Sequence, residues 1–343
     1  METKLKPFVS IYREALKDTL EKLTREHENS YGLYNGKTGL CMCYFLLAET
    51  ENNPDYKIKA RELLDGLSEN IASVQELDFA NGLAGIGWGI EWLVQNNFVD
   101  ANTDEILEDL DDELYKSVVF AKAASLSLHN GTLGKAMYFY KRLMAQNPNP
   151  VRYRMLCNQE CLVLLTDEMN ETLLDKEKGL LSVETFRQNL TPQLITEIAQ
   201  CLVFLIKLIP LRVNAEITER LICAILSYAT KYAETYVASK SKEHEDAFRY
   251  LLHSYLVAGT KLNDKSIIEN SKSLHEKYSL KETTSTGNNV FTNYLDMRIE
   301  HLLSRHITHR SVPEPKSVFE ILASVIDNKN AVSHSWDEAW LLS

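Results

Sequence analysis

The chain has 343 residues, of which 45% are hydrophobic and 25% are charged, as in an ordinary globular protein. Acidic residues outnumber basic ones by 48 to 37, so the formal net charge of −11 disfavours binding to nucleic acid or to an anionic membrane. No stretch approaches 18 consecutive apolar residues, and we expect no membrane span. The first 25 residues form an amphipathic pattern without the apolar region of a signal peptide, which predicts a cytoplasmic protein.

Helical periodicity continues along the chain, and no segment shows the alternating pattern of a β-strand. Asn, Pro and Gly separate the helical segments, as expected at helix ends. About 14 helices would form seven hairpins of one domain, residues 1–343. The predicted helices cover residues 7–26, 37–50, 55–73, 82–96, 103–123, 131–146, 151–169, 182–188, 191–209, 214–238, 243–259, 264–278, 290–305 and 315–328.

The sequence Asn-Gly-x-x-Gly occurs three times, at residues 35–39, 81–85 and 130–134. The copies follow one another after 46 and 49 residues, and each precedes an apolar, helix-forming stretch. A period of this size indicates repeated helical hairpins. We expect the Asn to cap each helix, and the two glycines to let a neighbouring helix or loop approach closely.

The cysteines and histidines do not form a convincing metal site in the sequence. All six cysteines lie in apolar helical stretches and resemble small core residues more than a disulfide framework. Cys157 and Cys161 are four residues apart but have no obvious further ligands. His301, His306 and His309 are flanked by arginines, which favours a solvated helix end over a metal site.

The three motifs and their surroundings, residues 32–39, 78–87 and 128–134, resemble the lanthionine synthetase C-like (LanC-like) family. The C-terminal sequence at 335–342 is also similar to that of bacterial members. The fold of this family is an α/α toroid, in which seven inner helices are surrounded by seven outer ones. The resemblance therefore implies an all-α protein with an α/α toroid fold over residues 1–343.

The best-known members of this family bind zinc and add a peptide cysteine to a dehydrated Ser or Thr, closing a thioether ring. Zinc lowers the pKa of the thiol and holds the thiolate. The zinc ligands of the family lie in Trp-Cys-x-Gly and Cys-His-Gly turns of the later repeats, and this sequence has neither. Its later cysteines, Cys201 and Cys223, are followed by neither His nor Gly. We therefore expect no metal, no other cofactor and no zinc-dependent cyclase activity.

Two family positions for proton transfer suggest candidate catalytic residues. Asp78 stands four residues before Gly82, where cyclases carry an acid. The family also has a His directly before the glycine of a following motif, but Asn130 occupies that place and His129 lies one residue earlier. Asp78 and His129 are thus the catalytic candidates, and a role in forming the turn is the alternative for Asp78.

The resemblance places the loops before the motifs at one mouth of the ring. Aromatic side chains in and after these loops are candidate ligand-binding residues: Tyr31, Tyr34, Phe79, Trp88 and Trp92. Trp88 and Trp92, one helical turn apart, could form a stacking platform for a sugar or peptide. Core packing is the alternative for both.

The sequence predicts a LanC-like protein without zinc-dependent cyclase activity that binds peptides or assists peptide modification or export. Its partner would be a peptide or a peptide-modifying or export protein. The alternative is a carbohydrate-active enzyme, a sugar epimerase or glycosidase, that uses Asp78 and Glu91 as a carboxylate pair. A cyclase with unrecognised ligands among the C-terminal histidines and the cysteines is a weaker third possibility.

Overall fold

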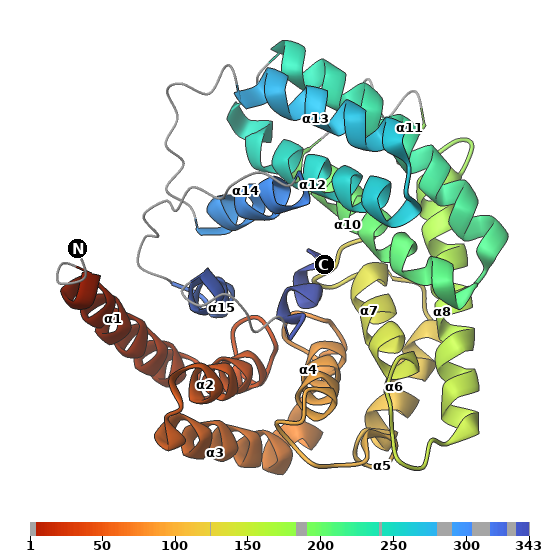
Figure 1. Ribbon diagram of the computed structural model, residues 1–343. Coiled ribbons are helices and arrows are strands. Elements are labelled where there is room, and N and C mark those ends of the chain that lie inside the picture. The colour runs from red at the N-terminus through yellow and green to blue at the C-terminus, as the bar shows by residue number, and fades with distance from the viewer. Residues whose placement is uncertain are drawn as a thin grey trace. The chain divides into compact units, whose positions relative to one another are not determined.

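The computed structural model describes residues 5–123, 125–182, 191–239, 242–279, 290–303, 316–327 and 334–342. In these ranges the regular structure consists of 14 α-helices and four short 3-10 helices, without a β-strand. Figure 1 labels the helices. The prediction of an all-α protein is confirmed. The predicted helix at 182–188 lies, apart from Ser182, outside the described residues.

The chain forms two compact units. The first comprises Met1–Leu114, Met144–Pro150 and Ser311–Trp336. The second comprises Tyr115–Leu143, Val151–Arg310 and Asp337–Ser343. That residues 1–343 form a single domain stays a prediction, and each unit is described by itself below.

The first unit is built around α2 (Lys37–Glu51), which packs against α1, α3, α4 and α15. The residues Thr38–Leu47 are all buried, so this helix is covered on every side and forms the centre of the unit. The other helices of this unit are α1 (Leu5–Glu26), α3 (Pro54–Asn70), η1 (Ile71–Ser73), α4 (Leu83–Gln95), α5 (Thr103–Ile106), the first part of α6 (Glu108–Val119), and α15 (Val318–Asp327).

The second unit is built around α12 (Glu245–Leu262), which packs against α10, α11, α13 and α14. The residues Ala247–Gly259 are all buried. The other helices here are α7 (Thr132–Leu143), α8 (Arg152–Leu174), α10 (Pro192–Leu208), η2 (Ile209–Leu211), α11 (Ala215–Ser239), η3 (Lys242–His244), α13 (Lys265–Ser279) and α14 (Val290–Leu302). A last 3-10 helix, η4 (Trp336–Trp340), begins at Trp336, which belongs to the first unit, and its other residues belong to the second unit.

One segment within the described ranges is long and apolar enough to cross a membrane, Pro192–Leu211 in α10 and η2. Of its apolar window, 61% is buried inside the protein, as in the core helix of a soluble protein. This burial agrees with the packing of α10 against α12.

The prediction of one continuous helix at 103–123 is wrong. The segment forms two helices, α5 and α6, which are separated at Leu107, whose backbone is not helical (φ −105°, ψ 11°). Leu107 is fully buried in a small core cluster with Leu83 and Leu110. The side chain of Asn102 caps α5 by accepting the amide of Asp104 at 3.2 Å. The break therefore places Leu107 in the core at the point where a continuous helix was predicted.

Candidate functional site

The three Asn-Gly-x-x-Gly motifs form the same backbone corner. In each, the amide of the first helical residue donates a hydrogen bond to the carbonyl seven residues earlier. The pairs are Lys37 to Ser30 at 2.9 Å, Leu83 to Glu76 at 2.9 Å and Thr132 to Ser125 at 3.0 Å. The period found in the sequence thus corresponds to a repeated structure.

The glycines of the second corner are required by the close approach of the loop before them. A Cβ on Gly82 would overlap the carbonyl of Glu76, and one on Gly85 would overlap the carbonyl of Phe79. No glycine in the described ranges has a positive φ. The glycines are therefore needed for space rather than for a left-handed backbone.

The prediction that the motif Asn caps the helix is wrong for α2 and α4. Their N-cap residues are Gly36 and Gly82, and neither helix start has a side-chain cap. The loop carbonyl seven residues earlier already accepts the first helical amide, so the exposed Asn35 and Asn81 are not required for this purpose.

The first two corners are joined to each other within the first unit. The amides of Leu33 and Tyr34 donate to the carbonyl of Ala80 at 2.9 and 3.0 Å. The Tyr34 and Phe79 rings meet edge to face, with centroids 6.2 Å apart. The structure therefore brings together two of the predicted ligand-binding residues.

Asp78 has the structural role that the sequence left open. Its carboxylate accepts the amide of Asn81 at 2.7 Å, and its carbonyl accepts the amide of Gly82 at 3.2 Å. The half-buried side chain thus holds the second corner in shape. A catalytic role for Asp78 stays a prediction.

The other loop candidates lie nearer the surface. The side chain of His129, in the second unit, is exposed, and its backbone amide donates to Ser127 Oγ at 3.1 Å. Tyr31, in the first unit, is half-buried, and Lys37 Nζ lies 4.9 Å from the centroid of its ring. Both side chains are accessible to a ligand, at least in part, and their roles stay predictions.

Phe79, Trp88 and Trp92 are fully buried, which favours the core-packing interpretation over a stacking platform. Trp88 meets Phe79 edge to face, with centroids 6.0 Å apart. Trp92 stacks on Phe98 at 5.4 Å. A ring without exposed surface offers no face to a sugar or peptide unless its neighbours move.

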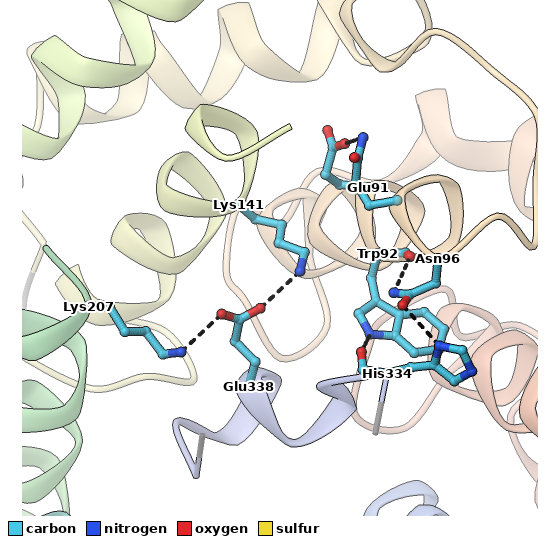
Figure 2. Close-up of polar contacts among 8 residues, drawn as sticks. Glu91, Trp92, Asn96, Lys141, Lys207, His334 and Glu338 are labelled. Atoms are coloured by element: carbon cyan, nitrogen blue, oxygen red, sulfur yellow. Dashed lines mark hydrogen bonds and ion pairs between the residues drawn. The ribbon is translucent and has the colours of Figure 1, made fainter. Parts of the chain in front are cut away.

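His334, which was not predicted from the sequence, completes this aromatic cluster within the first unit. Its carbonyl accepts the indole N–H of Trp92 at 2.8 Å, and its ring nitrogens face Asn96 Oδ1 at 3.1 Å and Glu49 Oε2 at 2.8 Å. Figure 2 shows His334 beside Trp92 and Asn96. Asn96 and Glu49 lie 238 and 285 residues away from His334 in the sequence, so no local pattern could predict these partners.

Glu91, the second acid of the carbohydrate-enzyme alternative, is fully buried in α4. Its Oε1 accepts from Thr103 Oγ1 at 3.1 Å and from Gln95 Nε2 at 2.8 Å. This arrangement joins α4 to the start of α5 rather than presenting a carboxylate to a substrate.

The second unit contains a polar cluster that was also not predicted from the sequence. Glu338 accepts from Lys141 of α7 through Oε2 at 2.9 Å and from Lys207 of α10 through Oε1 at 3.1 Å (Figure 2). Burial alone would raise the pKa of the Glu338 carboxyl, but the two ammonium groups and their hydrogen bonds outweigh it and lower that pKa. Glu338 therefore stays ionised inside the protein.

Asp337 extends this cluster toward α14, and Trp340 extends it toward α12. Its Oδ2 accepts from the Tyr294 hydroxyl at 2.8 Å and lies 3.7 Å from Arg298 Nε. The Tyr250 hydroxyl donates to the carbonyl of Trp340. We call the groups of the second unit that hold residues Asp337–Leu342 the tail site.

The described residues do not fit the zinc ion of the best-known family members. In these ranges no group of three or more His, Cys, Asp or Glu stands where it could hold a metal ion. Cys41, Cys43 and Cys201 are fully buried, and burial raises the pKa of each thiol. Cys223 is exposed. His306 and His309 lie outside the described residues.

The comparisons with known proteins agree with this fold. Residues 2–149 match the family model described as lanthionine synthetase C-like protein. The structure is similar to that of nisin cyclase, with a TM-score of 0.58 and 13% sequence identity, over 97% of this chain and 98% of that chain. No curated protein matches the sequence.

The likeness to nisin cyclase identifies the fold class as the α/α toroid, as predicted. The family model that matches residues 2–149 is that of the lanthionine synthetase C-like family, which was predicted from the glycine motifs.

Proposed function

We propose that this lanthionine synthetase C-like protein binds a peptide, as an accessory component of peptide modification or export, and has no zinc-dependent cyclase activity. The structural relative is by name a cyclase of nisin, which supports a peptide as the ligand. Its partner would be a peptide or a peptide-modifying or export protein, since the net charge of −11 disfavours nucleic acid.

One observation supports the proposed lack of zinc-dependent cyclase activity. The toroid fold extends over 97% of the chain, yet the thiols that could serve a zinc ion are either buried or stand without a cluster of further ligands in the described ranges. A protein zinc site needs three or four ligands around one point, and no described cysteine belongs to such a group. The six free cysteines also support a reducing compartment, and we infer a cytoplasmic location.

Elemental analysis of the purified native protein tests the absence of a zinc site. We expect zinc far below one ion per chain, both as purified and after incubation with excess zinc followed by gel filtration. One tightly bound zinc ion per chain would contradict the proposal.

An activity and binding assay tests the rest of it. A dehydrated, cysteine-containing precursor peptide of the nisin type would be incubated with the protein and zinc, and its free thiols counted by alkylation and mass spectrometry. We expect thiol loss no faster than without protein, together with measurable binding of the labelled peptide by fluorescence anisotropy. Zinc-dependent thiol loss would contradict the lack of cyclase activity, and absence of binding would contradict the peptide-binding role. Nisin cyclase serves as the positive control.

A further inference from the structure

The C-terminal residues Asp337–Leu342 are held in the second unit in the way that a bound peptide is held. Side chains from four helices contact this short segment: Lys141 from α7, Lys207 from α10, Tyr250 from α12 and Arg298 from α14. Each helix contributes a charged or hydroxyl group, so the contacts are directional and not simply apolar packing.

The tail site binds the main chain of the segment as well as its side chains. Arg298 Nη2 donates to the carbonyl of Leu342 at 3.0 Å. The Tyr250 hydroxyl contacts the carbonyl of Trp340 and lies 3.4 Å from that of Leu341. Contacts to main-chain carbonyls are available to any peptide of suitable length, whereas the ion pairs select acidic side chains.

The conformation of the segment depends on the tail site. Leu341 has φ of 54°, in the left-handed region that a bulky side chain rarely adopts. Two hydrogen bonds close this turn, from the amide of Leu341 to the carbonyl of Glu338 at 2.9 Å and from Leu342 to Asp337 at 3.2 Å. Because both leucines are fully buried, their contacts with the site offset the unfavourable backbone conformation.

The charges of the tail site are complementary to an acidic ligand. Lys141, Lys207 and Arg298 pair with the two carboxylates of Asp337 and Glu338. The lysine side chains are 14% and 16% exposed, so water screens them little. If the segment left the site, three cations would lose their carboxylate partners at one place, and this local positive charge favours binding of another acidic group.

We propose that the tail site is a binding site for an acidic peptide, and that the protein's own C-terminal segment occupies it as a tethered competitor. This inference rests on the proposed peptide-binding function and names the site and the class of ligand. The ligand would carry two adjacent acids followed within three residues by an aromatic residue and leucine, as residues 337–341 do. Because the segment is covalently attached, its effective concentration is high, and an incoming peptide binds by displacing it.

A binding assay on the full-length chain tests this inference. The probe is a fluorescein-labelled peptide with the sequence of residues 335–342, followed by fluorescence anisotropy. The D337N/E338Q variant keeps the segment but removes its charges. We expect the variant to bind the probe at least about tenfold more tightly than the wild type, because the internal competitor has lost its charge-assisted hydrogen bonds.

Three controls isolate the tail site. E177Q removes a carboxylate from an exposed loop residue and should bind the probe as weakly as the wild type does. A probe with Asn-Gln in place of Asp-Glu should bind the D337N/E338Q variant at least about tenfold more weakly than the acidic probe. Adding K141Q and K207Q to D337N/E338Q should reduce binding of the acidic probe by at least the same factor.

Hydrogen exchange on the wild type provides a second measurement in case the variant does not fold. Saturating probe should accelerate amide exchange in residues 337–342, because the segment is displaced, and the Asn-Gln probe should not. Equal probe binding by folded wild type and variant, or unchanged exchange in the wild type, would overturn the inference. If the nisin-type precursor still binds, the failure concerns the tail site alone. If neither peptide binds, the proposed function fails as well.

Discussion

The glycine corners and the tail site are maintained by different kinds of interaction. In the corners, backbone amides bind carbonyls seven residues earlier, and the same hydrogen bond recurs in all three. In the tail site, Glu338 binds Lys207 and Lys141, which are 131 and 197 residues away in the sequence. Local backbone geometry therefore leaves a periodic pattern in the sequence, whereas long-range charge pairing leaves none.

The largest effect that we expect concerns the space required at a corner. Gly85→Ala would place a Cβ into the carbonyl of Phe79, in backbone that cannot move without displacing the corner. We expect the free energy of unfolding to fall by about 3 kcal/mol or more, at the upper end of the usual cost of overpacking. Urea unfolding followed by circular dichroism measures the change.

Gly66 is the matched control, because it is a helical glycine outside the motifs. A Cβ on Gly66 would lie 3.5 Å from Lys37 Nζ, the end of a flexible side chain. Gly66→Ala should therefore stabilise α3 by about 0.5–1 kcal/mol, since Ala is the better helix former. If Gly85→Ala were equally well tolerated, the steric explanation of the motif would be wrong.

The second prediction concerns the ion pairs of the tail site. Glu338→Gln removes a buried carboxylate from two lysines that still reach some water. We expect the free energy of unfolding at pH 7 to fall by about 2 kcal/mol, within the range for hydrogen bonds to charged groups. A double-mutant cycle with Lys207→Gln measures the coupling, and additive effects would show that the pair contributes nothing.

The same pair should depend on pH in a defined direction. The folded-state pKa of Glu338 is lowered from 4.5, so its stabilising contribution is complete well above pH 4.5. That contribution is lost as the pH falls through the folded-state pKa. The stability difference between the wild type and Glu338→Gln should therefore narrow below pH 4. A difference that stayed constant down to pH 3 would argue against ionised Glu338 as its source.

The corners and the helical hairpins could be predicted from the sequence because their determinants are local. The three motifs predicted the repeat period and the helix starts, and their resemblance to a known family implied the fold class. The identity of the cap could not be predicted, because the carbonyls of Ser30 and Glu76 replace the expected side chains of Asn35 and Asn81. A helix-capping propensity describes which groups a residue is able to bind. The three-dimensional fold determines which acceptor lies within hydrogen-bond distance of the helical amide.

The polar groups of the candidate sites were mostly beyond sequence-based prediction. Asp78 could be found because it stands at a fixed distance from a motif, although the structure shows it forming a turn. Lys141, Lys207 and His334 carry no local pattern, and their partners lie far away in the chain. The similarity of the C-terminal sequence to that of family members was the one signal that pointed toward the tail.

The third prediction tests a buried histidine in α12, close to the tail site. His253 is fully buried, and neither ring nitrogen has a hydrogen-bond partner among the described residues. Burial, and to a lesser degree the positive charge of Arg298, lowers the pKa of His253 from 6.5 to about 3. Below pH 6.5 the unfolded chain therefore takes up a proton that the folded chain does not.

This difference should make the protein less stable in mild acid, by about 1.4 kcal/mol at pH 5.5 compared with pH 8. His253→Leu should remove this loss, as measured by urea unfolding at both pH values. His301→Gln changes an exposed histidine and should retain the loss. Equal acid sensitivity in His253→Leu and the wild type would show that this histidine does not titrate as the structure indicates.

The smallest effect that we expect concerns the second corner. Asp78→Ala removes the carboxylate that accepts the amide of Asn81, which should lower the free energy of unfolding by about 1 kcal/mol, as for the loss of a helix cap. Asp78→Asn keeps an oxygen acceptor and should lose only a few tenths of that amount. A catalytic acid would behave differently, because Asn cannot transfer the proton. If Asp78→Asn preserved stability but abolished a measurable reaction, the corner would be part of an active site.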